Sequence, residues 1–239
     1  MKDICAPKER RYGMTIELLF IEFGFLFTRL FVKTRITPNQ ITLLWGILLI
    51  FSSVLFIFDN LWLHVAGAIG WIVACAMDNT DGQVARYKKM FSKRGLFLDK
   101  LNHSLTYPLL FFCIGLGQYM VSGEIYSLIF GFMAGTFMML SLICEPLYAL
   151  AMGDSPKEMD RATAPTVFKK RLRSISPLFD RNLFLLILVA TILDLVLKFE
   201  LLWMGSFLEA LLPVYAIGFL IGFLTKAGMI YKMLDKPSD

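Results

Sequence analysis

"MDNTDGQVARYKKMFSKRGLFLDKLNH", residues 77–103, is a polar stretch in a chain of 239 residues that is 57% hydrophobic. Soluble domains are about 45–50% apolar, so this composition indicates an integral membrane protein. Ionisable side chains near the core of a bilayer are costly and usually mark a functional site. Four of them stand at the ends of apolar segments here: Asp78, Asp81, Asp99 and His103. The stretch is therefore the starting point for predicting the topology of the chain and the position of its functional site.

The apolar segments around this stretch predict an all-α, polytopic membrane fold with six transmembrane helices. Each segment is near or above the roughly 20 residues that a helix needs to cross a bilayer. We expect the helices at residues 38–58, 62–88, 99–121, 125–152, 181–198 and 202–231. The chain then divides into a cytoplasmic N-terminus with an interfacial helix (1–37), a six-helix transmembrane catalytic domain (38–231) and a cytoplasmic tail (232–239).

The distribution of basic residues predicts the orientation. Of the 24 Lys and Arg residues, only Lys198 falls on the side of the short linkers at 59–61, 122–124 and 199–201. Positive charge collects in cytoplasmic loops, so both termini and residues 88–94 should face the cytoplasm. The basic balance is then explained by attraction to anionic lipid head groups, and we expect no nucleic-acid partner.

Residues 14–33 could be mistaken for a seventh span. Charged residues recur among the apolar ones, which is typical of an amphipathic helix lying on the membrane surface. A true span would also reverse the orientation that the other linkers favour. After this segment, Thr37 and Pro38 predict the N-cap and the first turn of the first spanning helix.

The four ionisable residues fall into two pairs, each on one helix face. Asp78 and Asp81 are three residues apart on the second span, and Asp99 and His103 are four apart on the third, which we expect to begin near Asp99. If these helices are antiparallel neighbours, three carboxylates and an imidazole meet on the cytoplasmic side. Carboxylates crowded into a partly dehydrated pocket need cations. Oxygen ligands of this kind suit Mg²⁺, Mn²⁺ or Ca²⁺ rather than zinc.

Small and basic residues surround the carboxylates. Gly82, Ala85 and Gly95 remove side chains, so a bulky ligand can approach the backbone. Positive charge around them is supplied by Arg86, Lys88, Lys89, Lys93 and Arg94. Taken singly, such residues are more often helix caps, packing residues or solvated charges. Their joint spacing favours a phosphate ester, most simply a diphosphate.

This spacing closely resembles the signature D-x2-DG-x2-AR-x8-G-x3-D-x3-D of the CDP-alcohol phosphotransferase family, also called the CDP-alcohol phosphatidyltransferases. Seven of the eight fixed positions match, and the chain reads Asp78-x2-Asp81-Gly82-x2-Ala85-Arg86-x8-Gly95-x3-Asp99-x3-His103. The resemblance extends to the six-helix architecture, the amphipathic N-terminal helix and the sequence PNQIT at residues 38–42. The last three predicted spans carry no motif that we can match.

The resemblance implies an activity and a set of ligands. Family members transfer a phosphoalcohol group from a CDP-linked donor to an alcohol acceptor and release CMP. It implies two divalent cations, Mg²⁺ or Mn²⁺, held by Asp78, Asp81 and Asp99. It also implies a homodimer. The substrate-binding positions carried over are Gly82 and Ala85 beside the cytidine, with Arg86, Gly95, Asn39 and Thr42.

His103 departs from the pattern, because the family has a fourth Asp there that is usually cast as the general base. An imidazole can take a proton near neutral pH, since its ordinary pKa is about 6.5, but it prefers softer metal ions than a carboxylate does. Three readings stay open. His103 is the catalytic base, or it contacts an unusual acceptor, or the chain is an inactive paralogue or carries a substitution.

These features predict a membrane transferase of phospholipid biosynthesis in a prokaryotic inner membrane, with its active site facing the cytoplasm and CDP-diacylglycerol as its donor. One alternative is the transfer of a polar phosphoalcohol to a lipid acceptor. Another is a CDP-alcohol-binding protein without turnover. A third is a transporter with Asp194, Glu209 and Lys226 along its pathway, although we favour capping or interfacial positions for these residues.

One basic segment is a candidate binding site for the acceptor. The run FKKRLR, residues 168–173, and a nearby arginine could bind an acceptor phosphate, although a lipid-facing basic loop is the ordinary interpretation. The candidate residues are Lys169, Lys170, Arg171, Arg173 and Arg181.

Overall fold

The computed structural model describes residues 15–151, 182–197 and 206–234, and its regular elements in these residues are all helices. They are α2 (Thr15–Phe31), α3 (Pro38–Val54), the 3-10 turn η1 (Leu55–Ile57), α4 (Leu61–Lys88), α5 (Lys93–Ser122), α6 (Ile125–Ala151), α9 (Asn182–Leu197) and α10 (Phe207–Leu234). The predicted all-α fold is confirmed.

Five of the described helices are long and apolar enough to cross a membrane. These segments are residues 38–57 (α3 with η1), α4, α5, residues 125–148 of α6 and residues 207–232 of α10. The chain is therefore a polytopic membrane protein, as predicted. The predicted span at 181–198 is described over α9, whose apolar part is Leu185–Val196, so the count of six spans stays a prediction.

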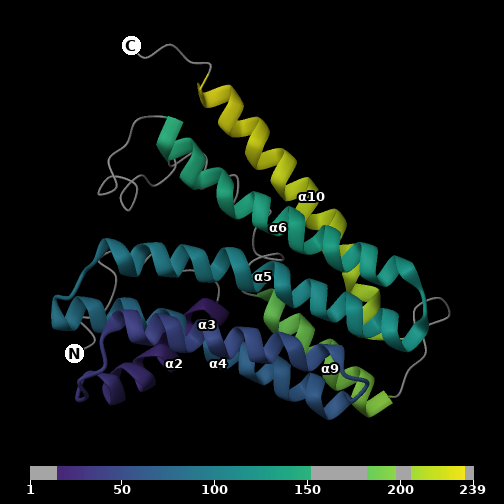
Figure 1. The fold of residues 1–239 in the computed structure, drawn as a ribbon, viewed down its shortest axis with the longest axis horizontal. Helices are drawn as coiled ribbons and strands as arrows, with labels where there is room; N and C mark the ends of the chain where they lie inside the picture. Colours follow the sequence, from purple (N-terminus) through teal and green to yellow (C-terminus); the bar gives the residue numbers. More distant parts are fainter. Residues whose placement is uncertain (1–14, 152–181, 198–205, 235–239) are drawn as a thin grey trace.

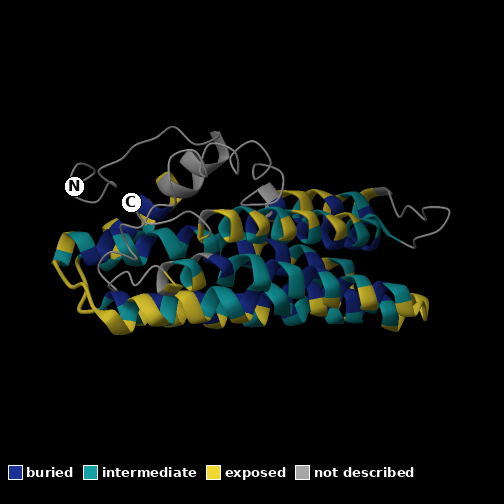
Figure 2. Cartoon of the chain, turned by 90° about the horizontal axis from the view of Figure 1, so that it is seen from above, coloured by how far each residue is buried: buried dark blue, intermediate teal, exposed yellow. Residues whose placement is uncertain are grey.

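The helices form a bundle that opens towards one end. Figure 1 shows α3, α4 and α5 side by side along the long axis, while α6 and α10 cross them obliquely and diverge from α5 towards the left. Exposed residues follow the outer edges of this bundle, and buried residues lie between the helices (Figure 2). The core includes Trp45, Phe56, Trp71 and Phe111, each no more than 1% exposed.

Glycines let α5 and α6 touch at the end where the bundle is closed. A Cβ atom at Gly115 would lie 2.7 Å from the carbonyl oxygen of Ser127, and a Cβ atom at Gly131 would lie 2.6 Å from that of Phe111. Any side chain at either position would push the helices apart, because both contacts are with backbone atoms. Small residues of this kind are the usual means of close helix packing in membranes.

The start of α3 is fixed as the sequence predicts. Thr37 is the N-cap: its hydroxyl accepts from the backbone N–H of Gln40 at 3.4 Å, and the Gln40 side chain accepts from the Thr37 N–H at 2.8 Å. Pro38 occupies the first turn, where its missing N–H costs nothing. This reciprocal cap sets the position of the next two turns of α3, which lie beside the candidate site.

The start of α5 differs from the prediction. The helix begins at Lys93 rather than near Asp99, and the Ser92 hydroxyl caps it by accepting from the Gly95 N–H at 3.0 Å. The prediction was wrong because hydropathy reports where a helix enters the apolar layer, whereas the cap determines where its backbone begins. Asp99 is therefore held inside a continuous helix rather than at its frayed end.

α2 packs on the end of α4 through small and polar residues. Gly24 faces α4, where a Cβ atom would lie 3.1 Å from the carbonyl oxygen of Ala76. The Thr80 hydroxyl lies 3.1 Å from the Gly24 carbonyl oxygen, and Thr28 donates to the Gln83 side chain at 2.7 Å. Apolar side chains cover the opposite, exposed face of α2: Phe23, Leu26 and Leu30. A helix with this outward apolar face suits a lipid environment, and its interfacial position stays a prediction.

Lys88 secures the segment between α2 and α3. Its ammonium group donates to the carbonyl oxygens of Phe31 at 3.2 Å, Thr34 at 2.8 Å and Ile36 at 2.8 Å. Phe31 is the last residue of α2, and Thr34 and Ile36 follow it, so these carbonyl oxygens lie where the ladder of intrahelical hydrogen bonds has ended. Lys88 was expected among the basic groups around the site, but its hydrogen bonds are with this segment.

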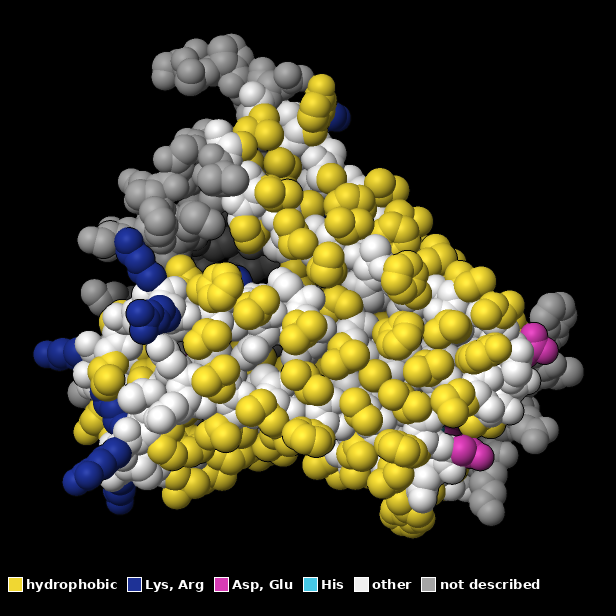
Figure 3. Space-filling model, viewed as in Figure 1, with side chains coloured by type: hydrophobic (Ala, Val, Ile, Leu, Met, Phe, Trp, Pro, Cys, Tyr) yellow, Lys and Arg dark blue, Asp and Glu magenta, His cyan; other side chains and the backbone are white. Residues whose placement is uncertain are grey.

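Charge divides the molecule along its length. Figure 3 shows hydrophobic side chains over the body, Lys and Arg mainly at the left end and acidic side chains at the right. The left end carries the junction of α4 and α5. This asymmetry agrees with the predicted cytoplasmic position of that junction, which stays a prediction.

Candidate active site

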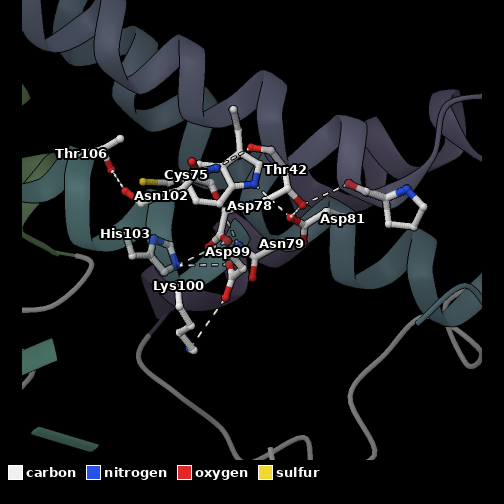
Figure 4. A network of polar contacts seen from close by, with 12 residues as sticks. Thr42, Cys75, Asp78, Asn79, Asp81, Asp99, Lys100, Asn102, His103 and Thr106 are labelled. Atoms are coloured by element: carbon white, nitrogen blue, oxygen red, sulfur yellow. Dashed lines mark hydrogen bonds and ion pairs between the residues drawn. The ribbon is translucent and has the colours of Figure 1, made fainter. Parts of the chain in front are cut away.

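Three helices bring the predicted site residues together. α4 supplies Asp78 and Asp81, and the antiparallel α5 supplies Asp99 and His103. Their side chains meet at one level, beside Thr42 of α3 (Figure 4). Asp78, Asp99 and His103 thus meet as expected, whereas Asp81, the expected fourth member of the cluster, faces α3.

Asp78, Asp99 and His103 form the tightest cluster. The His103 Nε2 atom lies 3.7 Å from Asp78 Oδ1 and 3.6 Å from Asp99 Oδ1, and these side chains are 22–27% exposed. One ligand atom from each residue can be chosen so that all three lie within 4.8 Å of one another. Two carboxylate oxygens and an imidazole nitrogen at this spacing fit a divalent cation after a small contraction. Lys100, 3.7 Å from Asp99 Oδ2, brings a positive charge to the exposed side.

Asp81 faces α3 instead of His103. Its Oδ2 atom accepts from the Thr42 hydroxyl at 2.6 Å and from the Trp45 indole N–H at 3.0 Å. The carboxylate is part-buried, and these two donors supply hydrogen bonds that water would supply at an exposed site. The predicted third metal ligand is therefore present beside the cluster and is held by its own partners.

A hydrogen bond joins α3 to α5 beside these groups. The Asn102 side-chain amide donates to the Thr42 carbonyl oxygen at 2.7 Å. It lies against Gly46, where a Cβ atom would come within 2.5 Å of the amide nitrogen. The absence of a side chain at position 46 thus lets Asn102 reach α3.

Aromatic rings enclose the imidazole of His103. Its ring centroid lies 5.1 Å from that of Trp45 and 5.3 Å from that of Tyr107. Tyr107 in turn packs edge-on against Trp71, with ring centroids 5.5 Å apart. The imidazole is therefore confined by α3 and by its own helix, which limits the orientations it can take.

The two motif glycines have different surroundings. A Cβ atom at Gly95 would lie 2.6 Å from Asn39 Oδ1, so this glycine lets α5 approach the start of α3. Asn39 Oδ1 also accepts from the Ser92 hydroxyl at 3.2 Å. At Gly82 a Cβ atom would meet the Arg86 guanidinium at an ordinary 3.5 Å, so packing does not exclude a side chain there. Ala85 is buried, at 8% exposure.

Sequence reasoning missed Trp45, Asn102 and Tyr107. A tryptophan or tyrosine in an apolar helix normally indicates core packing. The available signal was position: Trp45 follows Thr42 by three residues on one helix face, and Asn102 and Tyr107 flank His103 on α5. The basic candidates Lys169, Lys170, Arg171, Arg173 and Arg181 lie outside the described residues.

The residues considered for a transport pathway make structural contacts. Asp194 accepts from the backbone N–H groups of Phe207 at 2.6 Å and Leu208 at 3.1 Å, which caps α10. Glu209 accepts from the Ser127 hydroxyl. Lys226 donates to the Ser141 carbonyl oxygen at 2.8 Å. The contact of Asp194 agrees with the capping that the sequence favoured, and the contacts of Glu209 and Lys226 are with neighbouring helices.

The family comparison covers the whole site. A model of the CDP-alcohol phosphatidyltransferase family matches residues 35–208, which is more than half of the chain and includes α3, α4 and α5. No curated protein gave a significant match.

Proposed function

Because the chain belongs to the CDP-alcohol phosphatidyltransferase family, we propose that it transfers a phosphatidyl group from CDP-diacylglycerol to an alcohol acceptor and releases CMP, as a step of phospholipid biosynthesis. The observation that carries this proposal is the meeting of Asp78, Asp99 and His103, from two helices, within 4.8 Å and inside the matched range. An arrangement of this kind has the ligand types for a metal-bound diphosphate.

The carboxylates are the proposed metal ligands. Asp78, Asp81 and Asp99 would hold two divalent cations, Mg²⁺ or Mn²⁺, and the hard carboxylate oxygens of this set suit both ions. When bound, the cations neutralise the diphosphate and stabilise the charge that develops on CMP. Asp78 and Asp99 come from different helices, so the site depends on α3, against which α4 and α5 both pack.

His103 is the proposed general base. The acceptor oxygen attacks the phosphorus that carries the alcohol group, the bond from that phosphorus to CMP breaks, and the acceptor proton passes to His103 Nε2. This nitrogen faces the carboxylates of Asp78 and Asp99 at 3.7 and 3.6 Å, so it lies next to the proposed diphosphate position. The rings of Trp45 and Tyr107 would keep the imidazole in that orientation.

The donor is proposed to lie along α4 and the start of α3. Gly82 and Ala85 would lie beside the cytidine, and the ordinary contact distance at Gly82 supports space there. Further positions near the donor are Arg86, Gly95, Asn39 and Thr42. The basic end in Figure 3 supports an active site that faces the cytoplasm. Location in a prokaryotic inner membrane is an expectation. A homodimer, and the basic run at 168–173 with Arg181 as an acceptor site, remain expectations.

The test is CMP release by the purified protein in lipid vesicles. CDP-diacylglycerol with a panel of polar alcohols and Mg²⁺ or Mn²⁺ should give CMP, with the new phospholipid identified by mass spectrometry. Asp99→Asn should abolish release, and Asp59→Asn, an exposed carboxylate at the other end of α4, should not. Turnover only with a polar CDP-alcohol and a lipid acceptor would reverse the assignment of donor and acceptor. Binding of CDP-alcohols without turnover of any of them would contradict the proposal.

A further inference from the structure

Two side chains of α3 converge on one oxygen of Asp81. The Thr42 hydroxyl donates to Oδ2 at 2.6 Å, and the Trp45 indole N–H donates to the same atom at 3.0 Å. Thr42 is 3% exposed and Trp45 is fully buried, so both donors are held by packing. A carboxylate fixed through one oxygen presents its other oxygen, Oδ1, in a defined direction.

Trp45 also contacts the proposed base. Its ring centroid lies 5.1 Å from that of His103, with the planes tilted by 37°. A single residue of α3 therefore touches a proposed metal ligand on α4 with its N–H and the imidazole on α5 with its ring. A core tryptophan needs only one hydrogen-bond acceptor, and here that acceptor belongs to the site.

α3 is itself held in register with α5. Asn102 donates to the Thr42 carbonyl oxygen at 2.7 Å and lies over Gly46, where no side chain intervenes. The Thr37 cap fixes the first turn of the same helix. The segment 42–46 thus cannot shift without breaking contacts to both neighbouring helices.

We propose that Thr42 and Trp45 are positioning residues that aim Asp81 at a divalent cation, and that Trp45 couples this ligand to the orientation of His103. The inference rests on the proposed function, because it assumes that Asp81 binds the cation there. Groups that orient metal ligands typically change metal affinity or activity by about 10–100-fold when they are removed.

The experiment uses the full-length protein and measures two quantities. Mn²⁺ binding is followed by electron paramagnetic resonance of the free ion, and CMP release is measured as a function of Mn²⁺ at saturating donor. Thr42→Val and Trp45→Phe each remove one donor to Asp81; valine keeps the bulk of threonine, and phenylalanine keeps an aromatic ring at position 45. Each should weaken Mn²⁺ binding by about 10–100-fold, with turnover restored at saturating Mn²⁺. Thr42→Ser keeps the hydroxyl and should bind Mn²⁺ as the wild type does.

The ring contact has its own test. Trp45→Leu removes both the N–H and the ring, so its turnover should stay low even at saturating Mn²⁺, unlike that of Trp45→Phe. Trp71→Phe is the matched control: Trp71 is also buried, and its indole N–H donates to the Ser53 hydroxyl at 3.0 Å, away from Asp81. This control should leave Mn²⁺ binding unchanged.

Three results would overturn the inference. The first is wild-type Mn²⁺ affinity in the Thr42→Val, Trp45→Phe double variant. The second is intact Mn²⁺ affinity in Thr42→Val with only the KM for the donor raised, which would limit Thr42 to the donor-binding role proposed above. The third is full turnover in Trp45→Leu. If the wild type binds Mn²⁺ but turns over no CDP-alcohol, the proposed function fails, and the Mn²⁺ measurement still decides whether Thr42 and Trp45 position Asp81.

Discussion

Carboxylates occur at both ends of this bundle, and their contacts differ in kind. At the closed end, Asp194 accepts from two backbone N–H groups at the start of α10, and Glu209 accepts from the Ser127 hydroxyl. At the open end, Asp78 and Asp99 face the imidazole of His103 at 3.7 and 3.6 Å. A carboxylate that caps a helix satisfies donors that folding itself leaves unpaired. Asp78 and Asp99 come from different helices, lie beyond the first turn of each and face one imidazole, and their meeting indicates a ligand.

The largest expected effect is the loss of a metal ligand at the open end. Asp78→Asn should abolish CMP release while the protein still folds, because it removes a negative charge from the proposed cation site. Excess chelator should act in the same way, and added Mg²⁺ or Mn²⁺ should restore activity. The counterpart at the closed end, Asp194→Asn, should retain metal-dependent release. Full turnover of the wild type in excess chelator would remove the distinction between the two ends.

The next effect in size concerns His103. His103→Ala should lower turnover by roughly 10²–10⁴, the usual range for a positioned base, and leave donor binding nearly intact. His103→Asp, which restores the family pattern, should retain or raise the rate. The other histidine, His64, contacts the Phe58 carbonyl oxygen at 2.9 Å and serves as the control position.

The same variants separate the other readings of His103. A changed choice of alcohol in His103→Asp would assign the residue to the acceptor. Activity in His103→Asp alone would make the natural chain an inactive form. Wild-type turnover and acceptor choice in His103→Ala would leave His103 as a packing residue.

The third effect distinguishes the two motif glycines. Gly82→Leu should weaken donor binding roughly tenfold or more, a loss of about 1.4 kcal/mol, because its side chain would fill the proposed cytidine position beside Arg86. Gly95→Ala should instead lower the thermal unfolding midpoint, since its Cβ atom would lie 2.6 Å from Asn39 Oδ1. Titration of each variant with a CDP-donor and a melting curve provide the comparison. Unchanged donor affinity in Gly82→Leu would move the nucleotide elsewhere.

The smallest effect is at the closed end. Asp194→Ala should reduce stability by about 0.5–2 kcal/mol, the usual cost of losing a helix cap, with the rate per folded molecule unchanged. The measurement is thermal unfolding in detergent alongside CMP release. A loss of turnover greater than the loss of folded protein would show that Asp194 takes part in function, and the two ends would then not differ as described.

The sequence predicted those features that depend on spacing along one helix. The intervals from Asp78 to His103 located the site because residues three and four apart share a helix face. Thr37 and Pro38 predicted the start of α3 because capping is a local property. Contacts between helices could not be predicted from the sequence. Nothing in the residues around Lys88 distinguishes a lysine that donates to three backbone carbonyls from one that faces lipid head groups.

The buried residues that contact the site could not be recognised from the sequence. Trp45 looks like core packing in any apolar helix, and only the meeting of α3, α4 and α5 gives its N–H to Asp81. The beginning of α5 was missed for the opposite reason, since its first turn is polar and the hydropathy pattern does not include it. The charged residues of the site could therefore be predicted from the sequence, whereas the residues that orient them could be identified only from the packing of the helices.

The contact between Gly46 and Asn102 constrains how related sequences can diverge. Any larger residue at position 46 would displace the Asn102 amide, which lies 2.5 Å from the place of the missing Cβ atom, and would break its bond to the Thr42 carbonyl. Alanine at position 46 should then occur together with a shorter residue at position 102, while asparagine at 102 should be accompanied by glycine at 46. These two positions, 56 residues apart in the chain, are expected to covary as a pair.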